Sequence, residues 1–284
     1  MSRRPWPPRA VALLACPVCG QRLTALPGDA GLRCPAGHAF DRARQGHVTL
    51  LPPGHTPPSG DTAAMVADRA EVLAAGTFAG LTRVLADAVA AGDGPVDAVL
   101  DLGGGTGHHL AGVLDRLPSA VGVVLDSSRY AARRAAGVSP RVLAVVADTW
   151  ARLPVGDAAV DRVTVVFAPR NGPETARVLR PGGRLVVATP APDHLAELVG
   201  PLGLLRVDPD KAARLSASLE PHLAPTGGVA HREVLELDHP TVTTVVGMGP
   251  HARHLSRERL AAAVVGLPER VRVTLAVDVT TWTA

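Results

Sequence analysis

The chain has one lysine, three cysteines and few aromatic residues, and each scarcity narrows what it can do. Lys211 is the only lysine, so the other 28 of the 29 basic residues are arginines, which grip phosphates through two hydrogen bonds. Aromatic residues make up 2% of the chain, which limits base stacking as a way to bind nucleic acid. No apolar run is long enough to span a membrane, and the N-terminus is a poor secretory signal. We therefore expect a cytoplasmic protein with no membrane partner.

The three cysteines lie close together in the sequence, with a histidine in the place of a fourth. The spacing is Cys16-x2-Cys19, then fourteen residues, then Cys34-x3-His38. Three sulfurs and one nitrogen form a closed tetrahedral set suited to zinc. A disulfide framework would prefer an even number of cysteines, a thioredoxin-like pair would open a helix, and an iron–sulfur cluster usually takes four cysteines. We predict a structural zinc ion on these four residues and a reaction centre elsewhere.

Composition divides the chain into a zinc-binding module over residues 1–52, a linker and helix over 53–92, and a larger domain over 93–284. The module ends in a short expected strand, "HVTLLP", and the following "PPGHTPPSG" is typical of a linker. Apolar residues recur every three or four positions over residues 62–91, which predicts one helix capped by Asp61 or Thr62. Beyond residue 93, short apolar segments alternate with helical ones, which is typical of a parallel sheet built from strand–helix units.

The first of these units carries a glycine-rich loop. In "VDAVLDLGGGTGHHLAGVLDRL" a buried strand is followed by "DLGGGTG" and a helix, so that a ligand can lie against the main chain at the helix N-terminus. Such a loop alone does not distinguish nicotinamide, flavin and S-adenosylmethionine (SAM) sites. A second strand ends in Asp126, where a carboxylate can accept hydrogen bonds from both ribose hydroxyls. A third ends in Asp148, placed to hold an adenine amino group.

The order of the later motifs favours SAM. A fourth strand is expected over residues 161–167, and "LRPGGRL" leads a helix into a fifth. The ordered set "LDLGGGTG", "LD", "VVAD", "LP" and "LRPGGRL" resembles the Rossmann-like SAM-dependent methyltransferases, whereas a nicotinamide enzyme would have no reason for the Pro-Gly-Gly turn. The resemblance implies an α/β, Rossmann-like SAM-dependent methyltransferase fold behind the zinc-binding module.

Two absences narrow the methyl acceptor. Enzymes that methylate C5 of a pyrimidine attack with a cysteine, but all three cysteines are in the zinc motif. Exocyclic amines of bases are usually served by an Asn/Asp-Pro-Pro-aromatic turn after the fourth strand, where this chain has Phe167-Ala-Pro-Arg170. A ring nitrogen, a ribose hydroxyl, a protein or a small molecule remains.

The whole chain, apart from its first eight or ten residues, resembles the bacterial 23S rRNA (guanine-N1)-methyltransferases. The resemblance includes the zinc motif, "FDRARQGHVTLLP", "AAGTF", "FAP", "ATPAPDHL" and "MGPHARH". It implies that Phe78, Gly105, Thr106 and His194 contact SAM, although some relatives carry tyrosine at position 78. The general methyltransferase pattern adds four further residues. These are Asp101, Gly103, Asp126 and Asp148.

The same resemblance implies the target nucleotide, the oligomeric state and a role in antibiotic resistance. The target is a guanine in a 23S rRNA hairpin near the macrolide site of the ribosomal exit tunnel, and the protein is a homodimer. The "MGPHARH" stretch and the arginine-only basicity resemble the Gram-positive branch linked to tylosin-type macrolide resistance. We therefore expect an RNA-binding enzyme of rRNA processing that confers antibiotic resistance.

In this interpretation the guanine is flipped out of its stack, and N1 loses a proton as it accepts the methyl group. We expect Phe167, Arg170 and Asn171 to flank the target base, because ligands bind beyond the carboxyl ends of parallel strands. The group that takes the proton is not assigned. The module would grip RNA phosphates through Arg22, Arg33, Arg42 and Arg44.

Two alternatives belong to other functional classes. A small-molecule methyltransferase of antibiotic biosynthesis would share the SAM motifs but would have little use for an arginine-bearing zinc module. A nucleic-acid-binding protein with an inactive methyltransferase fold would keep the module and lose affinity for SAM. Titration with SAM, and the dependence of methyl transfer on RNA, separate the three possibilities.

Overall fold

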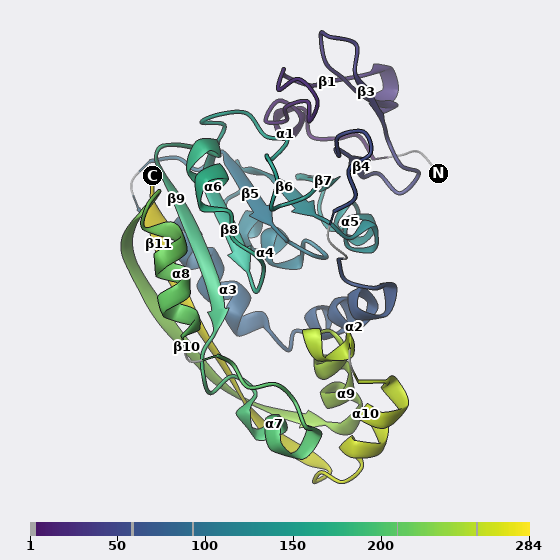
Figure 1. Ribbon diagram of the computed structural model, residues 1–284, viewed down its shortest axis with the longest axis vertical. Helices are drawn as coiled ribbons and strands as arrows, with labels where there is room; N and C mark the ends of the chain where they lie inside the picture. The colour runs from purple at the N-terminus through teal and green to yellow at the C-terminus, as the bar shows by residue number, and fades with distance from the viewer. Residues whose placement is uncertain (1–3, 58–59, 93, 209, 254) are drawn as a thin grey trace.

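The computed structural model describes residues 4–57, 60–92, 94–208, 210–253 and 255–284, and its centre is an eight-stranded sheet (Figure 1). The strand order is β10-β11-β9-β8-β5-β6-β7-β4. The six strands from β9 to β4 in this order are parallel to one another. Strand β11 is antiparallel to both β9 and β10. The bounds are β4 Val48–Thr49, β5 Ala98–Leu102, β6 Val121–Asp126, β7 Val142–Val146, β8 Val160–Val166, β9 Leu179–Pro190, β10 Ala224–Asp238 and β11 Arg270–Thr283.

The central strands are buried on both faces, which explains their nearly continuous apolar sequences. Every residue of β5 and β7 is buried. Alternate residues enter two separate cores: Leu100 and Leu143 belong to one, while Val99 and Ala144 belong to the other. Side chains of a strand point alternately to the two faces of a sheet, so each face needs its own cover of helices. The expected α/β fold with a parallel central sheet is confirmed.

Ten α-helices occur in the described residues. They are α1 Pro8–Val11, α2 Ala63–Ala74, α3 Ala79–Ala90, α4 His108–Arg116, α5 Arg129–Ala135, α6 Gly172–Val178, α7 Ala196–Leu202, α8 Lys211–Leu219, α9 His239–Gly247 and α10 Arg257–Val264. Helices α3 and α4 cover one core, and α8 covers the other. Helices α7, α9 and α10 gather at the bottom of Figure 1, around the ends of the long strands β10 and β11.

The single helix expected over residues 62–91 is wrong, because the structure has two helices there. Helix α2 ends at Ala74, and Gly76 has a φ of 78°, a left-handed conformation that stops the helix before α3 begins. The two axes differ in direction by 83°. The expected cap is confirmed, since the Thr62 hydroxyl accepts a hydrogen bond from the amide of Met65 at 3.3 Å. No single described helix is long and apolar enough to cross a membrane; α2 and α3 reach that length only when taken together across their bend.

The N-terminal module packs directly onto the sheet. Its own three-stranded antiparallel sheet consists of β1 Thr24–Ala25, β2 Gly31–Arg33 and β3 Ala39–Asp41. Strand β4 then pairs in parallel with β7, at the edge of the main sheet. Leu14, Leu23 and Leu32 of the module share a core with strand residues such as Val123. The expected strand in "HVTLLP" is confirmed, while the division of the chain at residue 52 stays a prediction.

Candidate functional site

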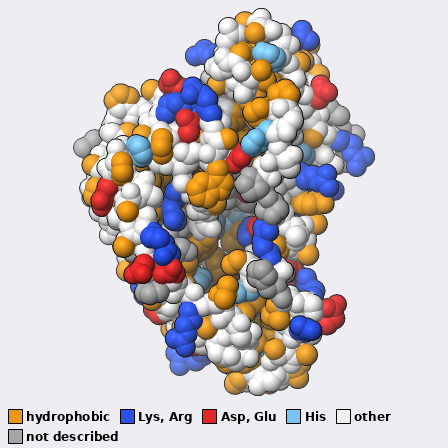
Figure 2. Space-filling model, viewed as in Figure 1, with side chains coloured by type: hydrophobic (Ala, Val, Ile, Leu, Met, Phe, Trp, Pro, Cys, Tyr) orange, Lys and Arg blue, Asp and Glu red, His pale blue; other side chains and the backbone are white. Residues whose placement is uncertain are grey.

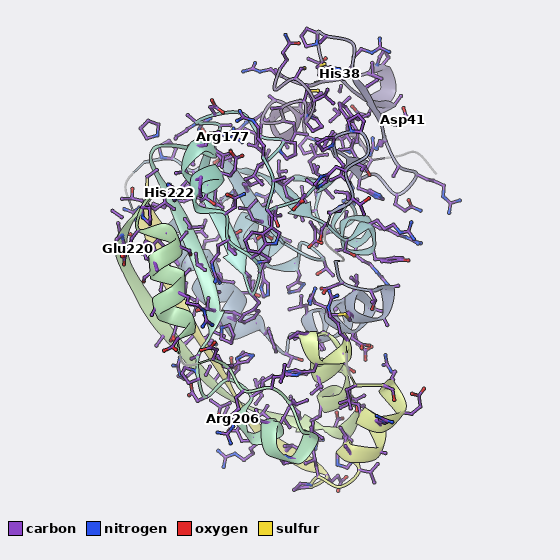
Figure 3. All side chains as sticks on the ribbon, viewed as in Figure 1. His38, Asp41, Arg177, Arg206, Glu220 and His222 are labelled. Atoms are coloured by element: carbon purple, nitrogen blue, oxygen red, sulfur yellow. The ribbon has the colours of Figure 1, made fainter. Side chains whose placement is uncertain are left out.

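The four predicted zinc ligands lie together in the module, where Figure 3 shows His38 beside sulfur atoms. Their ligand atoms are all within 4.8 Å of one another. Nδ1 of His38 lies 3.6 Å from Sγ of Cys16 and 3.3 Å from Sγ of Cys34. The sulfurs of Cys19 and Cys34 are 3.6 Å apart. Zinc bonds of about 2.3 Å to sulfur and about 2.0 Å to nitrogen set tetrahedral corners about 3.5–3.8 Å apart, so the residues fit a tetrahedral zinc ion.

Two tight turns bring these ligands together. The amide of Gly20 donates to the carbonyl of Cys16 at 2.8 Å, and that of Gly37 donates to the carbonyl of Cys34 at 3.0 Å. Both glycines have left-handed φ values, 72° and 89°, which strain residues with a side chain. The separation of 3.6 Å between the sulfurs of Cys19 and Cys34 excludes a disulfide between them, which requires about 2.05 Å. Four protein ligands fill the coordination shell, so the zinc is structural and leaves no position for a substrate.

The arginines of the module differ in what they can reach. Arg22, Arg33 and Arg44 are exposed. Arg42 is 9% exposed, and its guanidinium lies 4.6 Å from the centre of the Trp6 ring. The expectation that Arg42 grips RNA is therefore wrong, because its charge is used inside the module. The other three keep their charges at the surface, where RNA phosphates could reach them.

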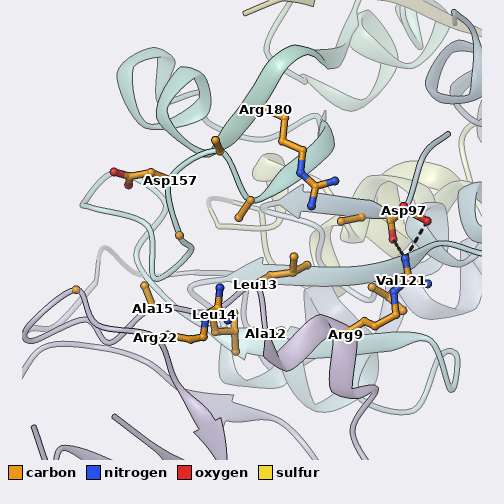
Figure 4. A pocket seen from close by; sticks show the side chains of 15 residues that line it. Arg9, Ala12, Leu13, Leu14, Ala15, Arg22, Asp97, Val121, Asp157 and Arg180 are labelled. Atoms are coloured by element: carbon orange, nitrogen blue, oxygen red, sulfur yellow. Dashed lines mark hydrogen bonds and ion pairs between the residues drawn. The ribbon is translucent and has the colours of Figure 1, made fainter. Parts of the chain in front are cut away.

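A cavity of about 540 Å³ lies between the module and the amino-terminal ends of the strands (Figure 4). Arg9, Arg22 and Arg180 line it together with Asp97 and Asp157. Arg9 and Asp97 already form an ion pair at 2.9 Å. Asp97 directly precedes β5, whereas the glycine loop directly follows it, so this cavity is at the opposite edge of the sheet from the predicted cofactor site.

The glycine loop wraps over a buried acid at the end of β5. Gly103 and Gly105 have left-handed φ values of 64° and 56°. Asp101 is 1% exposed, and one of its oxygens accepts a hydrogen bond from the Thr164 hydroxyl at 2.8 Å. A Cβ on Gly104 would lie 2.3 Å from the other oxygen, so this position has no room for a side chain. Burial raises the pKa of Asp101 to about 7, although the hydrogen bond from Thr164 acts in the opposite direction.

Asp126 at the end of β6 joins the next strand to the same loop. Its Oδ2 accepts a hydrogen bond from the amide of Gly105 at 2.9 Å, and its Oδ1 accepts one from the amide of Ser128 at 2.7 Å. Burial raises the pKa of Asp126, while these two backbone hydrogen bonds lower it. Each carboxylate oxygen can accept more than one hydrogen bond. Asp126 is therefore able to receive a further pair of hydroxyl groups, as ribose would require.

Asp148 lies just beyond β7 and contacts a residue that the sequence did not mark. Its Oδ1 accepts a hydrogen bond from the amide of Trp150 at 2.8 Å, and its Oδ2 lies 2.8 Å from Nε2 of His55. His55 belongs to the linker, where no motif surrounds it. Asp61 lies further along the linker, and its carbonyl accepts a hydrogen bond from the Ser128 hydroxyl at 2.8 Å. The linker thus lies against the carboxyl ends of β7 and β6, beside the acids predicted to hold adenosine.

The residues assigned to SAM by resemblance are not equally accessible. Phe78 is 2% exposed and Thr106 is 6% exposed. His194 is half-buried, and its Nδ1 lies 3.0 Å from the carbonyl of Ala276, which fixes the protonated nitrogen. The ring of His194 is 5.6 Å from that of Phe167, a candidate for the target side. The structure thus brings one predicted cofactor residue next to one predicted target residue, while contacts with SAM stay predictions.

The loop after β8 carries the three candidates for the target side. Phe167 is 42% exposed and has a left-handed φ of 53°. Arg170 is half-buried and, among the described residues, forms no hydrogen bond or ion pair; burial lowers the pKa of its guanidinium, as does the nearby charge of Arg214. The side-chain amide of Asn171 donates to three carbonyls of residues 149–151, and the place of Asn171 beside the target base stays a prediction. Figure 2 shows the molecule hollowed near its centre, in the region toward which β8 points in Figure 1.

Known proteins match both the module and the whole chain. Residues 14–56 match a family model for a zinc ribbon, described as "RlmA, N-terminal". The chain is 54% identical to a Micromonospora griseorubida protein named provisionally as a 23S rRNA (guanine-N(1)-)-methyltransferase, with 93% of this chain and 95% of that protein covered. It is 48% identical to the 23S rRNA (guanine(748)-N(1))-methyltransferase of Streptomyces fradiae, with 95% and 96% covered.

A solved structure supports the fold independently. It contains a Haloferax volcanii protein described as a methyltransferase, in complex with the Trm112 methyltransferase activator. The match has a TM-score of 0.53 at 20% identity and covers 80% of this chain and 99% of that chain. At this identity the likeness supports the methyltransferase fold and says nothing of the substrate.

Proposed function

Because this chain belongs to the family of 23S rRNA (guanine-N1)-methyltransferases, we propose that it transfers the methyl group of SAM to N1 of a guanine in 23S rRNA. One observation carries the proposal: the identity of 54% extends over 93% of the chain and so includes both the zinc module and the methyltransferase sheet. A small-molecule methyltransferase would not account for a match that includes residues 14–56. An inactive fold would not need the acids and glycines found at the carboxyl ends of β5 and β6.

The residues of the carboxyl edge suit the binding of SAM, whose methyl group is already activated by its sulfonium. In our proposal the ribose hydroxyls donate to Asp126, whose oxygens are held by the amides of Gly105 and Ser128. The adenine amino group lies near Asp148. The loop from Gly103 to Thr106, with Asp101 beneath it, takes the remainder of the cofactor, and Phe78 and His194 border it. The fit of this loop depends on glycine at position 104, where a Cβ would collide with Asp101.

The reaction requires the target guanine to leave its base stack, because N1 is otherwise hidden in the helix or loop. The bond from sulfur to methyl breaks as the bond from methyl to N1 forms, and the proton on N1 leaves. Proximity and in-line alignment supply much of the rate in such a reaction. We propose that Phe167 and Arg170 border this guanine, with the half-buried charge of Arg170 beside a phosphate of the flipped nucleotide.

The module serves RNA binding in this proposal, through the exposed Arg22, Arg33 and Arg44 and the shape of a 23S rRNA hairpin. The module packs near the amino-terminal ends of the strands, whereas the reaction takes place at their carboxyl ends (Figure 1). A homodimer would let the module of one copy hold RNA that reaches the site of the other. We further propose that the enzyme acts in the cytoplasm and that methylation near the macrolide site confers resistance to tylosin-type macrolides.

The test is methyl transfer from labelled SAM to large-subunit RNA that lacks this modification, followed by primer extension across the hairpin. An N1 methyl group blocks Watson–Crick pairing, so the expected result is a new stop at a single guanine. Transfer to no RNA by a protein that binds SAM would contradict the proposal. Analytical ultracentrifugation of the same preparation tests the homodimer, and growth on tylosin of a sensitive strain that expresses the protein tests resistance.

A further inference from the structure

Trp150 is the one tryptophan that the protein leaves at its surface. It is 59% exposed, whereas Trp6 is 5% exposed and Trp282 is 3% exposed. Indole has the largest apolar surface of any side chain, so Trp150 offers the largest exposed aromatic surface among the described residues of a chain with only 2% aromatic residues. None of the sequence motifs that predict the site contains this residue.

The backbone that carries Trp150 is held from two sides. Its own amide donates to Oδ1 of Asp148 at 2.8 Å. The side-chain amide of Asn171 donates to the carbonyls of Thr149, Trp150 and Ala151 at 3.1, 3.1 and 3.2 Å. The side-chain oxygen Oδ1 of Asn171 also accepts a hydrogen bond from the amide of Glu174 at 3.3 Å, which caps α6. An exposed ring on a fixed backbone loses little entropy when a ligand covers it, so it is organised in advance for binding.

The position of the ring points to one ligand. Asp148 lies two residues beyond the end of β7 and is the acid predicted to hold adenine. Asn171 belongs to the loop after β8, which carries the exposed Phe167. Asn171 therefore ties the loop of Trp150 to the target side of the site. Ligands of open parallel sheets bind beyond the carboxyl ends of the strands, where both loops lie.

We propose that Trp150 is the stacking surface for the extruded guanine and that Asn171 is a positioning residue that holds it. The inference rests on the proposed function, since it assumes a flipped purine at this edge. The indole face stacks on the guanine ring and replaces the neighbouring bases that the nucleotide leaves behind. Stacking of a base on an aromatic side chain contributes about 1–3 kcal/mol, or about 5- to 150-fold in affinity.

Fluorescence of the unmodified protein tests the contact directly. Because Trp6 and Trp282 are buried, quenching by acrylamide reports mainly on Trp150. We expect a 23S rRNA hairpin, added with S-adenosylhomocysteine, to quench Trp150 emission and to protect it from acrylamide. S-adenosylhomocysteine alone should do neither. Full protection by S-adenosylhomocysteine alone would show that Trp150 stacks on adenine instead, and RNA binding without any change would also overturn the inference. The Trp150→Phe variant is the matched control, since its remaining emission should not respond to RNA.

Kinetics separate stacking from mere stability. We expect Trp150→Ala to raise KM for RNA by about 10- to 100-fold with an unchanged Kd for S-adenosylhomocysteine, and Trp150→Phe to stay within about threefold of the wild type. Asn171→Asp keeps the cap of α6 but removes the donors to residues 149–151. It should raise KM for RNA about as Trp150→Ala does and lower the fluorescence anisotropy of Trp150 in the free protein.

The two proposals fail differently. If the wild-type protein transfers no methyl group to RNA, the proposed function fails. If the wild type is active and Trp150→Ala, folded and with its full zinc content, has an unchanged KM, only the inference about Trp150 fails. Should Trp150→Ala not fold, the acrylamide experiment on the wild type decides the question alone.

Discussion

The zinc module and the carboxyl edge of the sheet contain the two predicted sites, and they are built in different ways. In the module, four side-chain atoms surround one point. Zinc binding depends on the identity of the four residues that carry them, Cys16, Cys19, Cys34 and His38. At the carboxyl edge, the amide of Gly105 donates to Asp126, and the missing side chain of Gly104 leaves space for Asp101. The zinc site can be lost by replacing a ligand atom. The site at the carboxyl edge can be lost by adding a Cβ where a glycine leaves space.

The largest effect should come from the metal. Cys34→Ser removes one of two buried thiolate ligands, and structural zinc contributes about 10–16 kcal/mol to the folding of small zinc modules. We expect loss of the bound zinc and more than about a hundredfold loss of RNA methylation, because the core shared with the sheet is disturbed as well. Zinc content by atomic absorption and a methyl-transfer assay measure both. Full activity of a zinc-free protein would show that the module is dispensable.

The next effect is specific to the other region. Gly104→Ala places a Cβ 2.3 Å from Oδ2 of Asp101, so either the loop or the buried acid must move. We expect at least a tenfold weaker Kd for SAM by isothermal titration calorimetry, with an unchanged zinc content. Gly200→Ala is the matched control, since nothing lies within 4 Å of its added Cβ in α7, and it should bind SAM normally. Equal losses in both variants would contradict the steric argument.

A smaller effect is expected from pH. Burial raises the pKa of Asp101 to about 7, so the acid is protonated below neutrality in the free protein. SAM is cationic and favours the ionised acid, and its affinity should therefore fall by up to about tenfold for each pH unit below 7. Calorimetry between pH 5.5 and about 8 measures this dependence, which Asp101→Asn should abolish. A slope that persists in Asp101→Asn would assign the titration to another group.

The same shift fixes the sign of the effect of pH on stability. The folded protein keeps the Asp101 proton up to about pH 7, whereas the unfolded chain releases it near about pH 4. Between these pH values the folded state therefore binds more protons than the unfolded chain. The contribution of Asp101 to the free energy of unfolding falls as pH rises from about 4 to 7. Urea unfolding of the wild type and Asp101→Asn at both ends of this range should differ in that direction.

The smallest effects belong to the surface of the module. Replacing Arg22, Arg33 or Arg44 by alanine should weaken RNA binding modestly and reduce the slope of log K against log salt concentration by about one per phosphate contact. Arg42→Ala should instead lower the melting temperature, because its guanidinium packs on the buried Trp6 ring. Filter binding at several salt concentrations and a thermal melt distinguish the two kinds of arginine. A reduced salt slope for a fully stable Arg42→Ala would reverse our assignment.

Sequence reasoning predicted best where spacing or order determines the result. The zinc ligands follow from Cys-x2-Cys and Cys-x3-His spacing, and the parallel strands follow from apolar segments buried on both faces. The bend at Gly76 was missed because helical periodicity continues on both sides of it. The roles of His55 and Trp150 could not be predicted, since each depends on a contact with a residue distant in sequence, Asp148 or Asn171. The burial of Arg42 could not be predicted either, because the sequence does not show which arginine packs on the Trp6 ring.

The pairing of β4 with β7 has a consequence for the nascent chain. Residues 48 and 49 pair with residues 145 and 146, so almost a hundred residues must be synthesised before the module can dock. At about 5–20 residues per second the ribosome takes about 5–20 s over that stretch. During this interval the module has no sheet to pack on. Zinc binding can hold the module in its folded form until β7 is available. Zinc supply during translation, rather than after it, should then set the yield of active enzyme.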